Sequence, residues 1–269
     1  MDLRDRTVVL TGATEGIGRA TAVRLAGRVG HLVLHGLEPR AEVLGFLAGL
    51  GGDVTYLSAD FGHLDQIAGL AESIRGTADR VDLLVNNAGR PGARRRADSA
   101  DGIEATLQTN YLSTVVLTTA LRDRLGRVLN IASATHLSAR LRLADLGLAA
   151  GGYSAVGAYA QSKLAIVTYT CWLAGRLDGR TAEAASMHPG VIRSRLLAGM
   201  FSIEGDPPEH GADNIVRVAT RGGSINGRYF DETEPARPNP TAEDAATQRE
   251  LMNRTATLLA PIGIDPTAR

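Results

Sequence analysis

A tyrosine and a lysine one helical turn apart are the residues of this sequence best suited to proton transfer. Tyr159 and Lys163 stand four positions apart, so on a helix their side chains share one face. An ammonium group beside a phenol favours the phenolate and lowers a phenol pKa that is normally about 10. Tyr159 is therefore a candidate general acid for a carbonyl oxygen, or a general base for an alcohol. The alternative is an ordinary solvated contact on a helix surface.

The lysine of this pair is also distinctive by composition. Lys163 is the only lysine among 29 basic residues, and all the others are arginine. An arginine bias of this kind is typical of a GC-rich, bacterial genome. Because every other basic residue is arginine, the lysine at position 163 indicates a need for a compact ammonium that can exchange a proton. A guanidinium exchanges protons poorly.

A glycine-rich segment near the N-terminus has the form of a phosphate-binding turn. Residues 11–18 read Thr-Gly-Ala-Thr-Glu-Gly-Ile-Gly, after one apolar run and before an amphipathic stretch. Glycines let the backbone turn tightly and approach a pyrophosphate, while the following helix N-terminus offers free N–H groups. A glycine triplet alone is often only a turn, but the strand–turn–helix context favours dinucleotide binding.

Three further segments complete a recognisable combination. Asp60 ends one apolar run, Asn86-Asn87-Ala88-Gly89 follows another, and Ser133 follows a third. With the Gly-x-x-x-Gly-x-Gly turn and the Tyr159–Lys163 pair, the chain resembles the short-chain dehydrogenase/reductase family from residue 6 to about 230. The long segment between Ser133 and Tyr159, with His188-Pro189-Gly190, resembles the retinol-dehydrogenase-like branch, whose members reduce varied carbonyl substrates.

The resemblance implies a catalytic tetrad of Asn110, Ser133, Tyr159 and Lys163. In the family, the serine hydrogen-bonds the reacting oxygen and the asparagine holds a water that relays protons to the lysine. A nicotinamide cofactor supplies the hydride chemistry. Ser194 resembles the family's threonine that contacts the carboxamide. The expected cofactor contacts are Gly12, Thr14, Glu15, Gly16, Ile17, Gly18, Gly36, Arg40, Asp60, Phe61, Asn87, Ala88, Gly89, Tyr159, Lys163, Pro189, Gly190, Ile192 and Ser194.

The residues after the second expected strand favour NADP(H), with NAD(H) as the alternative. Gly36 stands where an aspartate that selects NAD is expected. Leu37 stands where NADP-using relatives place an arginine, and Arg40 is the candidate to replace it. Glu15 in the glycine turn argues for NAD(H).

Apolar runs alternate with amphipathic stretches along most of the chain, which predicts an α/β fold with a doubly wound parallel sheet. The residues fall into one catalytic domain at 1–232 and a C-terminal extension at 233–269 that is no separate domain. The extension contains a proline-rich link and a terminal helix at 242–259. Strands are expected at 7–10, 31–34, 54–57, 83–85, 128–131, 184–187 and 229–230, and helices at 18–28, 41–50, 64–75, 103–125, 159–177 and 213–220.

The composition of the chain limits the kinds of partner and site that are expected. The net charge is zero, so nucleic acid is not an expected partner, and residues 94–96 read as a solvated arginine run. A lone cysteine, Cys171, allows no internal disulfide and reads as a core residue. His136 and His188 are interpreted as structural, and no metal site is expected. Without a membrane-length apolar run or a signal peptide, no membrane partner is expected, and the protein is interpreted as cytoplasmic.

The function that follows is an NADPH-dependent carbonyl reductase or alcohol dehydrogenase acting on a small to medium hydrophobic molecule. A catalytically silent, cofactor-binding regulator or scaffold is the alternative, and a redox-neutral reaction is a third. Substrate walls are expected from residues 90–99, 134–158 and 191–212, the last of these as a lid. A homodimer or homotetramer through the helices at 103–125 and 159–177 is one expectation.

Overall fold

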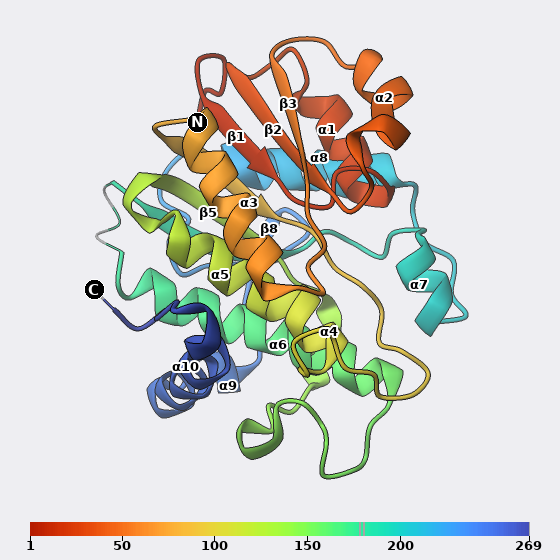
Figure 1. The fold of residues 1–269 in the computed structure, drawn as a ribbon, viewed down its shortest axis with the longest axis vertical. Helices are drawn as coiled ribbons and strands as arrows, with labels where there is room; N and C mark the ends of the chain where they lie inside the picture. The colour runs from red at the N-terminus through yellow and green to blue at the C-terminus, as the bar shows by residue number, and fades with distance from the viewer. Residues whose placement is uncertain (178, 180, 269) are drawn as a thin grey trace.

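The computed structural model describes residues 1–177, 179 and 181–268. Its centre is a sheet with the strand order β3-β2-β1-β4-β5-β6-β7-β8 (Figure 1). Every pairing is parallel except that of β7 with β8, so the predicted doubly wound α/β fold is confirmed. The strands are β1 (Thr7–Leu10), β2 (His31–Gly36), β3 (Val54–Ser58), β4 (Val81–Asn86), β5 (Leu125–Ile131), β6 (Glu183–His188), β7 (Tyr229–Asp231) and β8 (Glu234–Ala236).

Helices cover both faces of the sheet, and successive strand residues enter opposite layers. In β1, Val9 packs with one core cluster while Val8 and Leu10 pack with the other. The alternation follows from the two-residue period of a strand, and burial on both faces explains why these strands are apolar throughout. The first layer contains α3 (Leu64–Thr77), α5 (Ser113–Ala120) and α6 (Ala155–Ala174), and the second contains α1 (Gly16–Leu25), α2 (Arg40–Ala48) and α8 (Pro208–Thr220).

The strand order reverses between β1 and β4, which creates a crevice at their carboxyl ends. The glycine turn leaves β1 there, and the segment 86–89 leaves β4 beside it. The fold therefore brings these two sequence motifs to one place, as parallel pairing requires.

The helix expected over 103–125 is shorter than predicted. It begins with α4 (Ala105–Leu107), passes through a π-helical turn (Gln108–Leu112) and ends with α5 at Ala120. The buried Glu104 carboxylate caps the start of this helix, because it accepts hydrogen bonds from the backbone N–H groups of Thr106 and Leu107. Its end comes early because Leu125 already begins β5.

The C-terminal segment also differs from the expected link and single helix. Strand β8 pairs antiparallel with β7 where an extended link was expected. Two helices follow, α9 (Pro240–Glu243) and α10 (Ala245–Leu259), because Asp244 interrupts the helix and its carboxylate caps α10 through the N–H of Thr247 at 2.7 Å.

Helix α10 packs against α6, and Figure 1 shows the two side by side. Its Thr255 hydroxyl lies 2.7 Å from the Tyr111 hydroxyl, and both residues are fully buried. Every residue of α6 from Ala158 to Ala174 is buried except Cys171. One of the two helices expected to pair copies of the chain, the one at 159–177, is therefore buried over most of its length, and the oligomeric state stays a prediction.

The described residues contain neither a helix that could span a membrane nor a cluster of metal-binding side chains. No helix in this part of the chain has the length and apolar character to cross a bilayer. Among the same residues, no group of three or more His, Cys, Asp or Glu side chains gathers as a metal ion would require.

Candidate active site

Two adjoining cavities open at the carboxyl ends of the strands. The larger, of about 810 Å³, follows the glycine turn and the ends of β2 and β3. The smaller, of about 230 Å³, is lined by Ser133, Tyr159 and Lys163. The two share lining residues, so a long ligand in one reaches the other. The shared residues are Ile17, Asn87, Gly89, Ser194 and Leu196.

Close backbone packing builds the glycine turn. A Cβ at Gly18 would overlap the carbonyl oxygen of Gly12, so no other residue fits there without a shift. Gly12 itself has φ +66°, a conformation that favours glycine. Asn87, from the end of β4, donates from its side chain to the carbonyls of Thr11 (2.9 Å) and Gly12 (3.1 Å). The two motifs therefore form one cradle.

His35, in the middle of this cradle, supports the turn from β2. Its Nδ1 accepts from the backbone N–H of Gly12 at 3.3 Å, and its Nε2 donates to the carbonyl of Ala59 at 3.0 Å. The ring stacks on Phe61, with centroids 4.2 Å apart. Burial lowers the pKa of His35 to about 4, so the imidazole stays neutral and keeps both hydrogen bonds at physiological pH.

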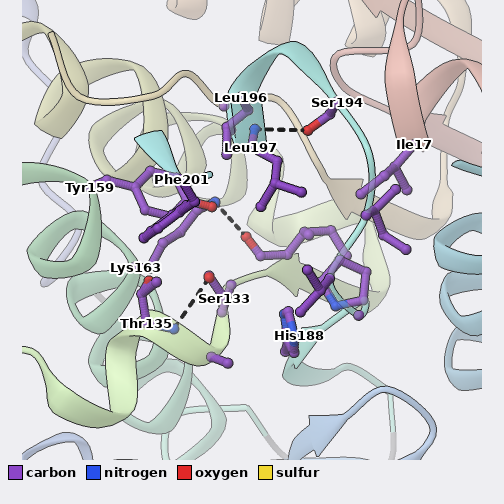
Figure 2. A pocket seen from close by; sticks show the side chains of 18 of the residues that line it. Ile17, Ser133, Thr135, Tyr159, Lys163, His188, Ser194, Leu196, Leu197 and Phe201 are labelled. Carbon is purple, nitrogen blue, oxygen red and sulfur yellow. Dashed lines mark hydrogen bonds between the residues drawn. The ribbon is translucent and has the colours of Figure 1, made fainter. Parts of the chain in front are cut away.

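The catalytic candidates converge on the smaller cavity, as Figure 2 shows. Tyr159 and Lys163 come from α6, and Ser133 follows β5. Burial raises the pKa of the Tyr159 phenol to about 12. A hydrogen bond with the Ser133 side chain acts in the opposite direction but is the smaller effect. Burial lowers the pKa of Lys163 to about 7, and its Nζ donates to the carbonyl of Ile131 at 2.8 Å. The expectation that the ammonium lowers the phenol pKa is therefore wrong for this structure. Loss of water raises the pKa of the acid Tyr159 and lowers that of the cation Lys163.

Asn110 lies in the π-helical turn, a deviation often found at functional sites. Its side chain donates to the Ser162 hydroxyl at 2.9 Å and exchanges two hydrogen bonds with the backbone of Arg90. A Cβ at Gly89 would come within 3.3 Å of the Asn110 side chain and 3.6 Å of Lys163 Nζ. Asn110 therefore lies beneath Gly89, outside the lining of both cavities but close to the lysine.

The turn after Ser133 is held by the C-terminal segment. His136 donates from Nδ1 to the carbonyl of Ser133 at 2.7 Å, and its Nε2 accepts from the backbone N–H of Asn239. The Asn239 side chain donates at 3.1 Å to the carbonyls of residues 136, 137 and 139. His136 is thus structural, as predicted, and it orients the backbone at Ser133.

Apolar side chains of the 191–203 segment form the opposite wall. Ser194 caps helix α7 (Arg195–Met200), because its hydroxyl accepts from the N–H of Leu197 at 3.1 Å. Leu196, Leu197 and Phe201 all line the cavity; in Figure 2, Leu196 and Leu197 lie beside Ser194, and Phe201 overlaps Tyr159 in the view. From the expected wall 134–158, only Ala134 and Thr135 line this cavity among the described residues.

Most of the expected cofactor contacts line one cavity or the other. The exceptions are Gly36, which lies against Thr14 and Tyr56, and Arg40, which is exposed at the start of α2. The lining residues among the predicted contacts are Gly12, Thr14, Glu15, Gly16, Gly18, Asp60, Phe61 and Ala88 in the larger cavity, Tyr159, Lys163, Pro189, Gly190 and Ile192 in the smaller, and Ile17, Asn87, Gly89 and Ser194 in both.

Several lining residues were not anticipated. His188 lines the smaller cavity although it was interpreted as structural, and its Nδ1 is buried without a hydrogen-bond partner. Glu38, Arg193 and Arg195 line the larger cavity. The carboxyl end of a strand would have indicated both His188, the last residue of β6, and Glu38, two residues after β2 ends. Nothing in the local pattern indicates the two arginines.

Comparison with known proteins supports the same interpretation. Residues 6–204 match the family described as short chain dehydrogenase. Human retinol dehydrogenase 13 is 32% identical over 94% of this chain and 84% of its own length. Mouse polyprenol dehydrogenase is 34% identical over 91% of this chain and 81% of its own length. The crystal structure of an uncharacterized Mycobacterium paratuberculosis protein superposes with a TM-score of 0.82 at 29% identity, covering 96% of both chains.

Proposed function

This chain belongs to the short-chain dehydrogenase family, in its retinol-dehydrogenase-like branch, and is an NAD(P)-dependent oxidoreductase; from that premise we propose that it interconverts a hydrophobic ketone or aldehyde and the corresponding alcohol. Two of the relatives named above are called retinol dehydrogenase 13 and polyprenol dehydrogenase. The apolar wall of Leu196, Leu197 and Phe201 supports a hydrophobic substrate here as well.

The residues present fit a nicotinamide dinucleotide. The glycine cradle leaves no room for a side chain at Gly18, and the larger cavity runs from that cradle to the smaller one. Backbone N–H groups at the start of α1 would hold the pyrophosphate, while Ser194 and Ile192 would hold the carboxamide end. When bound, the nicotinamide supplies or accepts the hydride.

The proposed proton chemistry belongs to Tyr159. With a pKa of about 12 the phenol keeps its proton at neutral pH and can donate it from Oη to a carbonyl oxygen, and Ser133 can hydrogen-bond the same oxygen. Lys163 has a pKa of about 7, so its Nζ can release and regain a proton near neutral pH. The buried amine is therefore suited both to stabilise a phenolate and to pass a proton onward.

The observation that carries this proposal is the convergence of Ser133, Tyr159 and Lys163 on a cavity that joins the glycine cradle. A catalytically silent regulator or scaffold would not need a buried lysine beside a buried tyrosine. A redox-neutral reaction remains the third candidate, and it would form product without net consumption of reduced cofactor.

A library of hydrophobic ketones and aldehydes, monitored by NADH and NADPH consumption, tests the proposal. The wild type should reduce at least one carbonyl, and Tyr159→Phe should reduce none of them at a comparable rate while still binding cofactor. Cofactor binding by the wild type without any turnover would favour the silent regulator. Cytoplasmic localisation stays a separate prediction, which cell fractionation would check.

The sequence favoured NADP(H), with Arg40 as the phosphate ligand. Arg40 is exposed and does not line the larger cavity, so the position of this residue gives that preference no support. The choice between the cofactors is set by the side chains around the end of β2.

A further inference from the structure

The smaller cavity has a polar end as well as an apolar wall. The wall comes from the 191–203 segment, whereas Thr135 and His188 line the cavity with polar side chains that the proposed proton chemistry does not use. In Figure 2 these two residues are drawn below Ser133, and Leu197 is drawn above it. We call Thr135 and His188 the polar end of the cavity.

Both side chains of the polar end carry an atom without a partner. The Oγ1 of Thr135 and the Nδ1 of His188 are buried and make no hydrogen bond. Neither ring nitrogen of His188 is hydrogen-bonded to any residue that the structure describes. A buried polar group without a partner is costly, so a ligand that supplies the missing hydrogen bonds would be favoured.

The backbone that carries the polar end is already held in place. The N–H of Thr135 donates to the Ser133 hydroxyl at 3.3 Å, and the carbonyl of His188 accepts from the N–H of Glu232 at 2.8 Å. A ligand therefore meets fixed chain and movable side chains. Rotation of the Thr135 side chain about Cα–Cβ, or of the His188 ring, turns a free polar atom toward the cavity without a backbone shift.

The polar end suits a neutral group rather than an ion. Burial lowers the pKa of His188 below its ordinary value, although Asp231 and Glu232 act in the opposite direction. A neutral imidazole offers one N–H donor and one acceptor, and the threonine hydroxyl offers both as well. Among the described residues that line this cavity, none is acidic and only Lys163 is cationic. A hydroxyl or carbonyl oxygen therefore matches these side chains better than a carboxylate or an ammonium does.

We propose that the substrate carries a second, neutral oxygen, as a hydroxyl or carbonyl group, which hydrogen-bonds to Thr135 and His188 while the reacting carbonyl faces Tyr159. The inference rests on the proposed function, since it takes the smaller cavity as the substrate site. It narrows the substrate class from a hydrophobic carbonyl compound to an apolar frame with two oxygen functions.

Matched aryl ketones test the polar end directly. The probes are acetophenones with a hydroxyl group at the ortho, meta or para position, each paired with the methyl analogue of the same position, which is similar in size but cannot hydrogen-bond. Isothermal titration calorimetry of the full chain, with saturating NAD⁺ and NADP⁺ in separate runs, gives Kd without turnover. The wild type should bind the hydroxyl member of at least one pair about fivefold to tenfold more tightly, as expected for one neutral hydrogen bond.

Thr135→Val and His188→Leu each remove polar atoms and keep an apolar side chain. Each should lower the hydroxyl-to-methyl preference by at least about threefold while cofactor Kd stays near the wild-type value. His188→Gln keeps a donor and an acceptor and should recover part of the preference. Thr119→Val is the matched control, because it makes the same change in α5 at a residue that lines neither cavity, and it should leave the preference unchanged.

Equal Kd values for both members of every pair in the wild type would overturn the inference, and this comparison needs no variant. So would an unchanged preference in both Thr135→Val and His188→Leu, or weaker cofactor binding in these variants without a change in the preference. Reduction of the same ketones, followed with NADH and NADPH, separates this inference from the proposed function. A preference that Thr135→Val lowers, without reduction of any ketone, would contradict the proposed function and leave the polar end standing. Binding of no probe would overturn the inference.

Discussion

Lys163 is buried, and its Nζ donates a hydrogen bond to the carbonyl of Ile131. Burial lowers the pKa of this amine to about 7, and its Nζ lies 5.6 Å from the centroid of the Tyr159 ring. A compact ammonium near its own pKa can stabilise a phenolate and exchange a proton. A guanidinium is larger and stays charged at every accessible pH.

Lys163→Arg should therefore fail to preserve activity although it keeps a positive charge. We expect kcat to fall by at least about two decades, within the range of roughly 10²–10⁴ for general acid–base catalysis. The measurement is kcat, with cofactor Kd, on any carbonyl that the wild type reduces. Tyr159→Phe is the companion variant and should lose at least as much kcat while its cofactor Kd stays near the wild-type value.

Retention of more than about a tenth of wild-type kcat by Lys163→Arg, a loss below ~1.4 kcal/mol, would contradict a special role for the lysine. Its presence in an arginine-rich chain would then be an accident of composition.

His35 makes the stability of the glycine cradle depend on pH. Its pKa is about 4 in the folded protein against 6.5 in an unfolded chain, so the unfolded state binds more protons between these values. The contribution of His35 is complete above pH 6.5 and is lost as the pH falls toward 4. At about 1.36 kcal/mol per pKa unit, the loss amounts to about 3 kcal/mol.

Urea unfolding between pH 4 and pH 8 measures this effect. His35→Phe should show a smaller slope of unfolding free energy against pH below 6.5, whatever its absolute stability, and the wild-type slope above 6.5. Burial also lowers the pKa values of His136 and His188, so part of the slope should remain. An unchanged slope in the variant would assign the acid sensitivity to other groups.

At the scale of elements, α7 differs from the helices that cover the sheet. None of its residues is buried, and it is attached at its start by the Ser194 cap. The strand-like bridge between Ile192 and Asp206 ties the two ends of the segment together, so residues 193–205 form a loop closed at its base. The expected lid range of 191–212 extends too far, because α8 begins at Pro208.

We expect this loop to become ordered over the cavity when cofactor binds. Amide hydrogen exchange should be slower within 191–207 when NADH is present than when it is absent. We expect this protection because Leu196 and Leu197 would then contact apolar groups instead of water. Helix α10 is the internal control and should exchange equally in both states. Protection confined to the glycine turn, with none in 191–207, would show that the segment is no lid.

At the scale of the whole molecule, the C-terminal segment completes the helical layer over α6. The α10 side chains of Leu251, Met252 and Leu259 are buried, and Asn239 reaches the turn that carries Ser133. A helix covered in this way has its apolar faces satisfied within one chain. We therefore expect that copies of the chain do not associate through α6.

Sedimentation velocity should show a monomer, or an oligomer whose interface lies away from α6. Leu251→Ala should lower the free energy of unfolding by about 2–5 kcal/mol, the cost of a large-to-small change in a core. Thr247→Ala, on the same helix, is the control: it keeps the backbone N–H that Asp244 caps, and it should change stability little. A wild-type dimer that α6 substitutions dissociate would contradict the covered-face argument.

Short sequence motifs and the spacing of apolar residues were enough to predict the fold class and the main candidate site residues of this protein. The glycine turn, the Tyr159–Lys163 pair and the alternation of strands and helices all depend on residues close in sequence, and their chemistry and period can be recognised without coordinates. Burial on both faces made the strands apolar, so even the sheet class followed from the pattern.

Only the tertiary structure decided what distant segments do to one another. The hydrogen bond of His35 with Gly12, the contacts of Asn239 with the turn after Ser133, and the hydrogen bond between Tyr111 and Thr255 join residues 23 to 144 positions apart. Glu38 is a shorter-range case, since it lines the larger cavity from a position two residues after β2 ends. Such contacts depend on which surfaces meet after the sheet has formed. The spacing of apolar residues along the chain does not indicate which surfaces these will be.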